Sequence, residues 1–393
     1  MSEENNIPEH WQVKKLGEIC QIQTGKFDAI HAKSNGKYRF YTCAFEHMRC
    51  DTNRFNGECL ILPGNGANVG EVFYYNGEFD AYQRTYVING IKTLPKFLYY
   101  HLLCFWKKLN QDKQFGSATN YIRIGNFNDY VVSFPPFQVQ LTIVSKIEEL
   151  MSDLENGKQQ LLNAQQQLKV YRQSLLKAAF EGKLTNVKTV ECELPKHWRM
   201  STIGDVFEVF IGSTPKRNNS NYWGGNINWL SSGEIAFCNI KSTKEKITTE
   251  GLENTSCKIH PIGTVIIAMI GEGKTRGQAA ILKVASSHNQ NTAAIRVNNK
   301  IYKSELLYYY LVLKYEDNRR VGSGNNQKAL NKERVKGIPI PIPPLKEQEL
   351  IVDNLESKLT VCDKIEETIK VALLKSESLR QSILKKAFEG KLL

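Results

Sequence analysis

The chain has 393 residues, of which 41% are hydrophobic and 23% are charged, as in a globular protein of two or three domains. No apolar run approaches the ~20 residues of a membrane-spanning helix, and the acidic, polar start is unlike a signal peptide. The nine cysteines form no CxxC pair, which argues against a disulfide framework or a zinc site, so we expect a cytoplasmic protein with reduced thiols. The net charge of +12 favours a nucleic-acid partner only weakly.

The sequence is a tandem repeat whose clearest copies are basic, helix-forming phrases. RQSLLKAAFEGKL begins at Arg172, and RQSILKKAFEGKL begins at Arg380. The Pro-Pro motif and the glutamine that precede the first phrase recur at the same spacing before the second. IPEHWQVKKLGEIC from Ile7 also pairs with LPKHWRMSTIGDVF from Leu194. The order is therefore A1–B1–A2–B2, in which the B segments match and the A segments differ in length and sequence.

Segment A1 is expected to fold as an α+β domain made mostly of strands and loops. The β-type runs CLILP from Cys59 and EVFYY from Glu71 are separated by Gly, Asn and Pro turns. PKFLYYHLLCFW from Pro95 predicts one short apolar helix. Because the pair His10-Trp11 recurs in A2, we interpret each tryptophan as a core anchor rather than a functional residue.

Segment B1 predicts a long coiled-coil helix. Pro135 and Pro136 precede it, where proline is tolerated, and Gly182 stands where a helix C-cap is expected. Gly157 is its one weak point, at a cost of about 1 kcal/mol relative to alanine. Apolar or small residues step by three and four along one seam: Ile147, Leu150, Leu154, Gly157, Leu161, Ala164, Leu168, Tyr171, Leu175 and Ala178.

Segment A2 repeats the pattern of A1, and B2 repeats the pattern of B1. The β-type runs TVIIAMI from Thr264 and AAIRV from Ala293 are followed by the helical run SELLYYYLVL from Ser304. Segment B2 has a rougher seam that ends at Gly390. Its members are Leu355, Cys362, Ile365, Ile369, Ala372, Leu379 and Ile383.

The two B helices are expected to pair with each other, because a helix of ~45 residues is about 65 Å long and cannot bury its apolar stripe alone. Antiparallel pairing would place A1 and A2 at opposite ends of a rod, whereas parallel pairing would crowd them together. In the alternative, each helix packs only on its own A domain. We predict an α+β fold with two mostly β domains separated by an antiparallel coiled coil. The predicted boundaries are 1–136, 137–184, 185–343 and 344–393.

No catalytic signature is evident in the sequence. GEGKTRGQ from Gly271 resembles a phosphate-binding loop, but Ala268 stands where a Walker A motif requires its first glycine, and no helical pattern follows. The chain has no Asn-Pro-Pro-Tyr, GxSxG or HExxH motif. We therefore expect a non-enzymatic chain with no catalytic residue, no metal site and no cofactor of its own.

The A segments instead have polar loops with interspersed aromatic residues, such as LPGNGANVG from Leu62 and HNQNTAA from His288. Arg and Lys pair with guanine edges and phosphates, Asn and Gln pair with adenine, and glycine lets the backbone come close. For any single residue, a solvated loop is the simpler explanation. The same composition in two unlike domains favours binding.

These features resemble the specificity subunits of Type I restriction–modification systems over nearly the whole chain. The resemblance rests on LPKHWRMSTIGDV, INWLSSGEI, GEGKTRGQAAIL with NQNTAAI, IPIPIPPLKEQELIV and RQSILKKAFEGKL. The first repeat departs from this pattern, since Val139 stands where the second repeat has Glu347. That departure fits two domains that read different half-sites.

The resemblance implies two target recognition domains, each of which reads one half of a split double-stranded DNA site. The paired helices would set the gap between the halves and present surfaces to two methyltransferase subunits, which bind S-adenosylmethionine and methylate a flipped adenine at N6. Restriction subunits would use ATP and Mg²⁺ to cleave unmethylated DNA in this phage-defence system. In the alternative, the chain is a coiled-coil interaction scaffold without base-specific reading.

The candidate DNA contacts are polar and cationic side chains of the loops, of which about a third would touch DNA. In A1 they are Lys26, Arg39, Asn65, Asn68, Gln83, Arg84, Thr119, Asn120, Tyr121 and Arg123. In A2 they are Lys216, Arg217, Asn218, Ser231, Ser232, Lys274, Arg276, Gln278, Asn289, Gln290, Arg319, Asn325, Asn326, Gln327 and Lys328.

Overall fold

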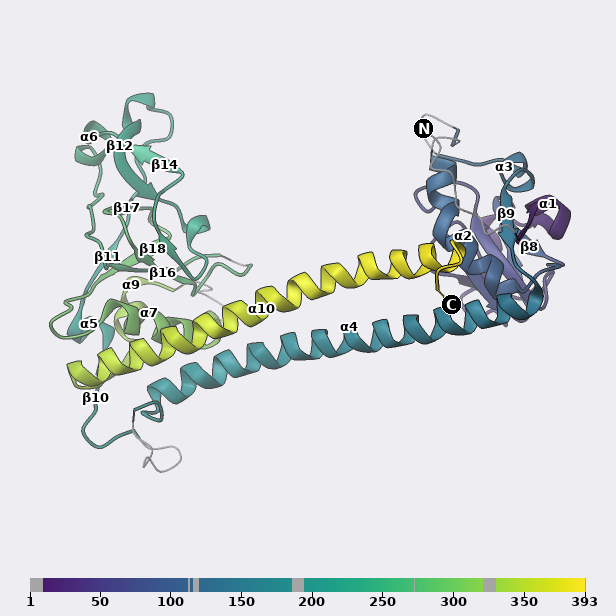
Figure 1. Cartoon of the computed structure of the whole chain (residues 1–393). Coiled ribbons are helices and arrows are strands. Elements are labelled where there is room, and N and C mark those ends of the chain that lie inside the picture. The colour runs from purple at the N-terminus through teal and green to yellow at the C-terminus, as the bar shows by residue number, and fades with distance from the viewer. Residues whose placement is uncertain are drawn as a thin grey trace. The chain divides into compact units, whose positions relative to one another are not determined.

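The computed structural model describes residues 10–111, 114–115, 120–185, 194–271, 273–320 and 330–392. The chain divides into two compact units: Met1–Asn163 with Ile369–Leu393 form unit 1, and Ala164–Thr368 form unit 2. Two long helices, α4 (Phe137–Phe180) and α10 (Leu345–Phe388), each contribute to both units (Figure 1). None of the described helices combines the length and the apolar character that a membrane crossing requires.

Among its described residues, unit 1 has three small sheets and three α-helices besides its parts of α4 and α10. The strands are β1 (Gln12–Lys15), β2 (Gln21–Thr24), β3 (Tyr38–Tyr41), β4 (Met48–Cys50), β5 (Glu58–Pro63), β6 (Phe73–Asn76), β7 (Phe79–Ala81), β8 (Thr85–Asn89) and β9 (Val131–Phe134). The helices are α1 (Leu16–Ile19), α2 (Pro95–Asn110) and α3 (Ile124–Asn128). An antiparallel sheet has the order β2-β8-β5-β6, a second sheet has the order β4-β3-β7, and β1 pairs with β9.

Unit 2 has the same kinds of sheet. The strands are β10 (Arg199–Thr202), β11 (Glu208–Ile211), β12 (Trp223–Leu230), β13 (Cys238–Ile240), β14 (Glu245–Ile247), β15 (Val265–Ala268), β16 (Ala279–Leu282), β17 (Ser287–His288), β18 (Thr292–Arg296) and β19 (Pro339–Ile342). The helices are α5 (Ile203–Val206), α6 (Thr249–Glu253), α7 (Ser304–Leu313), α8 (Tyr315–Arg320) and α9 (Lys332–Lys336). The sheet orders are β11-β18-β15-β16-β13, β14-β12-β17 and β10-β19.

The globular parts of the two units share one topology. The strands β2, β8, β5 and β6 correspond to β11, β18, β15 and β16, and the parallel pair β3–β7 corresponds to the parallel pair β12–β17. Each predicted β-run forms a strand, although the run from Glu71 becomes a strand only at Phe73. The two predicted short helices form as α2 and α7. The structure therefore confirms that A1 and A2 are repeats of one fold.

The tryptophans of the two His-Trp pairs lie in the cores. Trp11 packs on Phe97 of α2, with ring centroids 6.1 Å apart, inside the core of unit 1. Trp198 is buried in the core of unit 2. The interpretation of both residues as core anchors is confirmed.

A buried glutamine ties each long helix to the short helix of its domain. Gln140 of α4 accepts a hydrogen bond from the Leu94 N–H at 2.9 Å, and Gln348 of α10 accepts one from the Lys303 N–H at 2.8 Å. Leu94 and Lys303 are the N-cap residues of α2 and α7. Each glutamine also donates to the carbonyl of the first proline in its Pro-Pro motif. Because buried amides are costly to leave unpaired, these bonds fix where each long helix begins.

The long helices pack against each other in antiparallel order within each unit. In unit 1, Ile147 near the start of α4 and Leu384 near the end of α10 belong to one core cluster. In unit 2, Leu175 near the end of α4 and Leu355 near the start of α10 do so. The predicted antiparallel pairing is therefore present in both units. The alternative, in which each helix packs only on its own A domain, is wrong.

On α4, two residues of the predicted seam are buried, Ile147 and Leu175. The others are half-buried, except Tyr171, which is 49% exposed and contradicts the prediction. Its neighbour Arg172 faces α10 instead and forms ion pairs with Asp363 and Glu366, at 2.7 and 3.0 Å. A guanidinium that reaches two carboxylates favours this rotation of the helix over burial of the phenol.

The predicted seam on α10 is wrong at Ile365 and Leu379, which are 44% and 51% exposed. Leu355, Cys362 and Ile369 are buried, in steps of one heptad. The buried line of α10 thus keeps one position of each heptad, and at these two places the second position, three residues further on, is left uncovered.

Each repeated phrase has a phenylalanine, the last residue of its long helix, that lies in a core. Phe180 meets Tyr310 of α7 in unit 2, with centroids 4.9 Å apart, and Phe388 meets Phe97 of α2 in unit 1 at 5.2 Å. Figure 1 shows this end of α10 beside α2. Two glycines follow with φ of +73° and +68°, as predicted for helix C-caps: Gly182 and Gly390.

Glu347, in the first turn of α10, holds the His-Trp pair of unit 2. Its carboxylate accepts hydrogen bonds from Thr185 Oγ1 at 2.6 Å, His197 Nε2 at 2.8 Å and Trp198 Nε1 at 3.0 Å. Burial acts to raise the pKa of the Glu347 carboxyl, but the three hydrogen bonds outweigh it and lower the pKa below its usual 4.5. Val139 occupies the equivalent position in unit 1 and provides no such acceptor.

We expect the Glu347→Gln substitution to destabilise unit 2 by about 1–3 kcal/mol at pH 7. Because the folded-state pKa lies below the unfolded value, the stabilisation is present above the unfolded pKa and is lost as the pH falls through the folded pKa. Urea unfolding between pH 7 and pH 3 would measure the difference, with exposed Glu367→Gln as the control. If the wild type and E347Q lost the same amount of stability on acidification, the Glu347 carboxylate would not be the stabilising group.

Candidate nucleic-acid interface

In unit 1, hydrogen bonds bring the polar loops of A1 together at the ends of strands. The loop after β5 donates backbone bonds to the loop before β8 at 2.9 Å and to the loop before α3 at 2.8 Å. From the first of these loops, Asn68 Nδ2 donates to the Cys43 carbonyl after β3 at 2.9 Å. Gln83 Nε2, before β8, donates to Asp28 Oδ2 after β2 at 3.2 Å. The loops after β2, β3 and β5 and before β8 and α3 therefore form one connected surface.

The cationic candidates of unit 1 differ in how they are held. Lys26 and Arg84 are exposed, and their side chains have no hydrogen-bond or ion-pair partner within the described ranges. Arg39 instead donates to Tyr41 Oη at 3.2 Å and lies 4.4 Å from the Tyr75 ring centroid. Lys26 and Arg84 are thus available to an anionic ligand, whereas Arg39 braces the aromatic cluster beneath the loops.

Arg123 also rests on aromatic rings. Its guanidinium carbon lies 4.3 Å from the Phe115 ring centroid, and its Nη2 donates to Tyr121 Oη at 3.2 Å. Tyr121 forms a backbone bridge with Asn65, next to exposed Asn120. The segment before α3 is thereby joined to the loop after β5, and four of the predicted residues lie close together.

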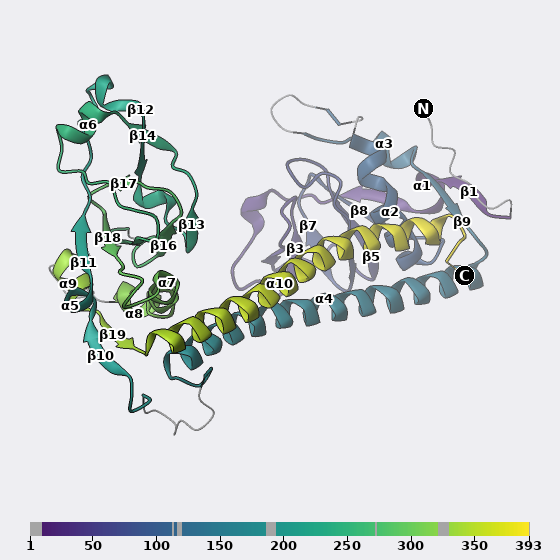
Figure 2. The same ribbon diagram turned by 60° about the vertical axis from the view of Figure 1, so that its left-hand side comes forward.

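In unit 2, the equivalent loops of A2 are brought together in the same way. The loop after β11 donates a backbone hydrogen bond to the His288 carbonyl at 2.9 Å, and the Asn289 N–H donates to the end of β12 at 2.9 Å. The loop after β15 donates to the Asn291 carbonyl at 2.8 Å. Figure 2 shows β12, β14 and α6 at the end of unit 2 farthest from α10.

Arg217, in the loop after β11, is exposed, but its guanidinium lies against aromatic rings and a carboxylate. Its guanidinium carbon lies 3.9 Å from the Trp223 ring centroid and 5.0 Å from that of Trp229. It pairs with Glu245 of β14, to which its Nη2 donates at 3.0 Å, and this hydrogen bonding lowers the pKa of the Glu245 carboxyl. A guanidinium held this strongly fixes the loop rather than extending from it.

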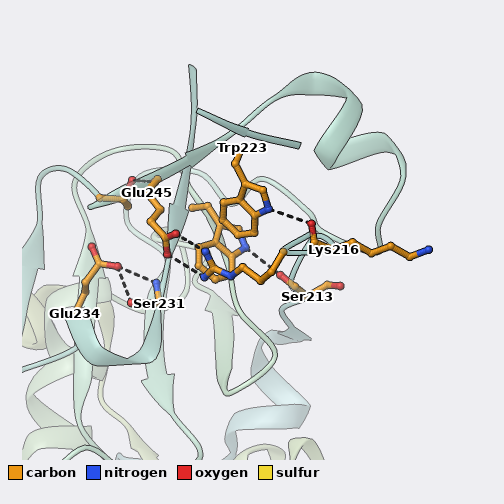
Figure 3. Close-up of polar contacts among 9 residues, drawn as sticks. Ser213, Lys216, Trp223, Ser231, Glu234 and Glu245 are labelled. Carbon is orange, nitrogen blue, oxygen red and sulfur yellow. Dashed lines mark hydrogen bonds and ion pairs between the residues drawn. The ribbon is translucent and has the colours of Figure 1, made fainter. Parts of the chain in front are cut away.

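The loop that Arg217 fixes presents polar side chains. In Figure 3, Trp223 Nε1 donates to the Lys216 carbonyl, at 3.2 Å, while the Lys216 side chain extends away from the cluster. Ser231 Oγ donates to Glu234 Oε2 at 2.9 Å, and Ser232 follows in a 3₁₀ turn. Three of the predicted contacts of unit 2 are exposed and have no side-chain hydrogen-bond or ion-pair partner among the described residues: Lys216, Asn218 and Lys274.

The GEGKTRGQ loop packs against α8. Arg276 Nη2 donates to the Arg319 carbonyl at 2.8 Å, and Arg319 Nη2 donates to the Gly273 carbonyl at 2.8 Å. Tyr315 Oη donates to the Lys274 carbonyl at 2.5 Å. A strand, β16, follows the loop instead of the helix that a Walker A motif requires. Both arginines therefore shape this loop, and Lys274 is its exposed cation.

The amides of unit 2 also differ in accessibility. Asn289 is 8% exposed, and its Oδ1 accepts no hydrogen bond within the described part of the chain. Gln290 is exposed, and its Oε1 accepts a hydrogen bond from Thr214 Oγ1. Gln278, which precedes β16, is half-buried. Of these three amides, Gln290 is the one placed to meet a ligand.

Five predicted residues lie outside the described ranges and stay predictions: Thr119, Asn325, Asn326, Gln327 and Lys328.

The same loops carry exposed apolar side chains, which the polar composition of these loops did not indicate. Ile30 after β2 is 91% exposed, Phe45 after β3 is 68% exposed, and Ile270 after β15 is 46% exposed. Apolar side chains read the methyl group of thymine in the major groove. The available signal was a bulky apolar residue inside a polar loop, where no strand or helix periodicity accounts for it.

The chemistry offered by these surfaces is that of recognition. Ammonium, guanidinium and amide groups bind phosphates and base edges, and aromatic rings support them. In the described portions of the chain, no group of three or more His, Cys, Asp or Glu residues is arranged to hold a metal ion.

Comparison with known proteins gives one consistent family. The model of the Type I restriction modification DNA specificity domain matches residues 8–164 and again 195–375. The specificity subunit of the EcoDI Type I restriction enzyme of Escherichia coli is 30% identical over 98% of this chain and 89% of its own length. The StySPI specificity subunit of Salmonella potsdam is 26% identical over 70% of this chain and 61% of its own length.

Solved structures share the fold over nearly the whole chain. A chain from structural work on complex assembly and conformational transition of the type I R-M system has a TM-score of 0.77 at 18% identity, covering 98% of this chain and 99% of its own. The HsdS subunit of Thermoanaerobacter tengcongensis has a TM-score of 0.66 at 18% identity, covering 98% of each chain. Two family-model matches and a relative at 30% identity over almost its full length place this chain in the family of Type I restriction–modification DNA specificity subunits.

Proposed function

We propose that this chain recognises a bipartite DNA sequence, with one half-site read by each unit. The observation that supports this is that two topologically equivalent domains bring the same set of loops together but carry different side chains on them. Equivalent scaffolds with unlike loops suit two different half-sites. We assign target recognition domains to 1–136 and 185–343, and spacer segments to 137–184 and 344–393.

The proposed contacts fall into two groups. Exposed side chains whose donor groups meet no partner among the described residues would reach phosphates and base edges directly, and held side chains would keep the loops in place. The first group is Lys26, Arg84, Lys216, Asn218, Lys274 and Gln290. The second group is Arg39, Arg123, Arg217, Arg276 and Arg319.

We infer that other subunits supply the catalysis. Two methyltransferase subunits would bind the long helices and carry S-adenosylmethionine, and restriction subunits would carry ATP and Mg²⁺. Exposed apolar residues of α10 offer contact area for such partners, since Leu350 is 57% exposed and Leu374 is 67% exposed. This chain would contribute sequence specificity and no chemical step.

Methylation mapping of the host genome, with and without the gene for this chain, tests the proposal. Loss of N6-methyladenine from one split motif, two short blocks around a fixed gap, is the expected result. An unchanged methylome, with the methyltransferase subunits expressed, would contradict base reading and favour an interaction scaffold.

We expect Lys26→Ala and Arg84→Ala each to weaken DNA binding by the assembled complex and to reduce the salt slope of log K by about 1. Each variant would remove a cation that no group within the described residues neutralises. Fluorescence anisotropy titrations between 50 and 200 mM salt would measure the slope, with Lys146→Ala, an ion-paired residue of α4, as the control. A slope that stays at the wild-type value in both variants would remove these residues from the interface.

A further inference from the structure

A chain of hydrogen bonds runs through the interior of unit 2. Arg296 Nε lies 3.1 Å from His260 Nδ1, and His260 Nε2 lies 3.2 Å from His288 Nε2. His288 Nδ1 lies 2.7 Å from Thr292 Oγ1, which donates to the Asn289 carbonyl at 2.9 Å. His260 and His288 are each 1% exposed, and Thr292 is fully buried. These hydrogen bonds link Arg296, the last residue of β18, to the turn that precedes the same strand.

The donors in this chain point in one direction. Arg296 Nε can only donate, so His260 Nδ1 must accept, and the proton of a neutral His260 then resides on Nε2. That proton is donated to His288 Nε2, which places the His288 proton on Nδ1, facing Thr292 Oγ1. The Thr292 hydroxyl proton is left for the Asn289 carbonyl. One tautomer of each histidine satisfies every group.

Protonation of either ring would break this order. Burial, together with His288, Arg296 and Lys258, lowers the pKa of His260 to about 3, and burial lowers the pKa of His288 to about 4. The cations Arg296 and Lys258 lie over the Phe210 ring beside His260, at 4.6 and 5.0 Å. A second proton would set two N–H groups against each other or against a cation, so both rings stay neutral near pH 7.

The turn at the end of this hydrogen-bond chain carries Gln290, an exposed amide of unit 2. Asn289 is bound at its carbonyl by Thr292 and at its N–H by the end of β12. The next residue, Gln290, accepts from Thr214 through Oε1, which leaves its Nε2 donors for a base acceptor. Small shifts of the turn would therefore move the Gln290 amide out of register with a base edge.

Unit 1 has no counterpart of the two histidines at this position. Tyr41 pairs with Ala81 in the parallel pair β3–β7, as Leu230 pairs with His288 in β12–β17. Ala81 thus occupies the place of His288. Thr85 begins β8 as Thr292 begins β18, and both are fully buried, but Thr85 has the Cys43 thiol as its side-chain neighbour, at 3.7 Å. The hydrogen-bond chain is therefore a property of the second domain alone.

We propose that Arg296, His260, His288 and Thr292 are positioning residues that set the Gln290 turn for base recognition in the second half-site. This inference rests on the proposed function. On this proposal, discrimination among bases near Gln290 depends on these four hydrogen-bonded residues, although none of them touches DNA.

A matched pair of variants tests the inference. The Thr292→Val variant keeps the shape of the side chain but lacks the hydroxyl. The Thr292→Ser variant keeps the hydroxyl but lacks the methyl group. The complete complex with its methyltransferase subunits is assayed on duplexes that carry the methylation motif or single-base changes in either half-site. We expect T292V to lose about tenfold of its discrimination in the second half-site and T292S to retain it. Discrimination in the first half-site is expected to stay at the wild-type value in both.

Each outcome decides one question. A wild-type complex that prefers no sequence at either half-site would overturn the proposed function itself. Wild-type discrimination in T292V, or an equal loss at both half-sites in a folded complex, would overturn the positioning role while leaving the proposed function standing. If T292V does not accumulate as a folded protein, the Arg296→Met variant is assayed in its place. Arg296 is half-buried, and it is the first donor of the hydrogen-bond chain. Full second-half discrimination in R296M would then reject the inference.

Discussion

Replacing Phe388 with alanine is expected to lower the free energy of unfolding of unit 1 by about 3–5 kcal/mol. Phe388 is 4% exposed, although it lies near the end of the chain. Its ring centroid lies 5.2 Å from Phe97, 5.1 Å from His101 and 5.9 Å from Phe105, all of α2. Removal of the ring leaves a cavity between α2 and α10 that the two helices cannot close without moving.

Urea unfolding and amide hydrogen exchange would measure this effect. Exchange in α2 should accelerate in F388A, while exchange in α7 of unit 2 should not change. Leu379→Ala, an exposed position on the same helix, is the matched control and should cost little. A loss below about 1 kcal/mol in F388A would show that the end of α10 is not part of the core of unit 1.

The same packing explains why one phrase occurs twice. Each copy ends a long helix inside the core of the domain that the other repeat supplies: Phe180 of B1 lies with α7 of A2, and Phe388 of B2 lies with α2 of A1. The recurrence is visible in the sequence, and the helix was predicted from it. It did not predict this exchange, because a repeat offset is the same whether a helix packs on its own domain or on the other one.

Secondary structure was predictable where one physical signal dominated. The run from Ser304 is apolar, unbroken and free of Gly and Pro, and it forms α7 over Ser304–Leu313. The seam of α10 was predictable only in part. Ile365 and Leu379 fit the apolar spacing of three and four residues as well as the buried positions do. Which of these residues become buried depends on the partner helix.

The interface was predictable as loops but not as side chains. Composition indicated that the segments after β2, β11 and β15 bind a polar ligand. Within each unit, backbone hydrogen bonds join such segments to the other loops of the same unit. Nothing in the spacing shows that Arg217 is held by Trp223 and Glu245, or that His260 lies beside His288. Such partners come from distant segments, so each side chain's availability depends on tertiary contacts that one sequence does not encode locally.

The second large effect is expected at two glycines, one in each unit, that directly follow the first strand of the main sheet. Gly25 follows β2, and a Cβ atom on it would lie 1.6 Å from the Ala81 carbonyl oxygen. Gly212 follows β11, and a Cβ atom there would lie 2.1 Å from the His288 carbonyl oxygen and 2.3 Å from that of Asn289. In both units the chain crosses directly over the turn before β8 or β18, so only glycine fits without movement of the backbone.

We expect Gly25→Ala to destabilise unit 1 by at least ~3 kcal/mol and to abolish discrimination in the first half-site, because the loops after β2 and before β8 are forced apart. Gly125→Ala in α3 is the control, since a Cβ atom there meets nothing within 4 Å. Unfolding and single-base discrimination would be measured on both variants.

Gly212→Ala is expected to act on the second half-site instead, since it displaces the turn that carries Gln290. The two glycine variants therefore separate the half-sites. Loss of discrimination at the same half-site in both variants would contradict the assignment of one half-site to each unit. Wild-type stability and discrimination in G25A would show that the close approach of these two loops is not required. The geometry argues against that result, because the carbonyl that the new methyl group meets belongs to the backbone of a buried strand and cannot rotate away.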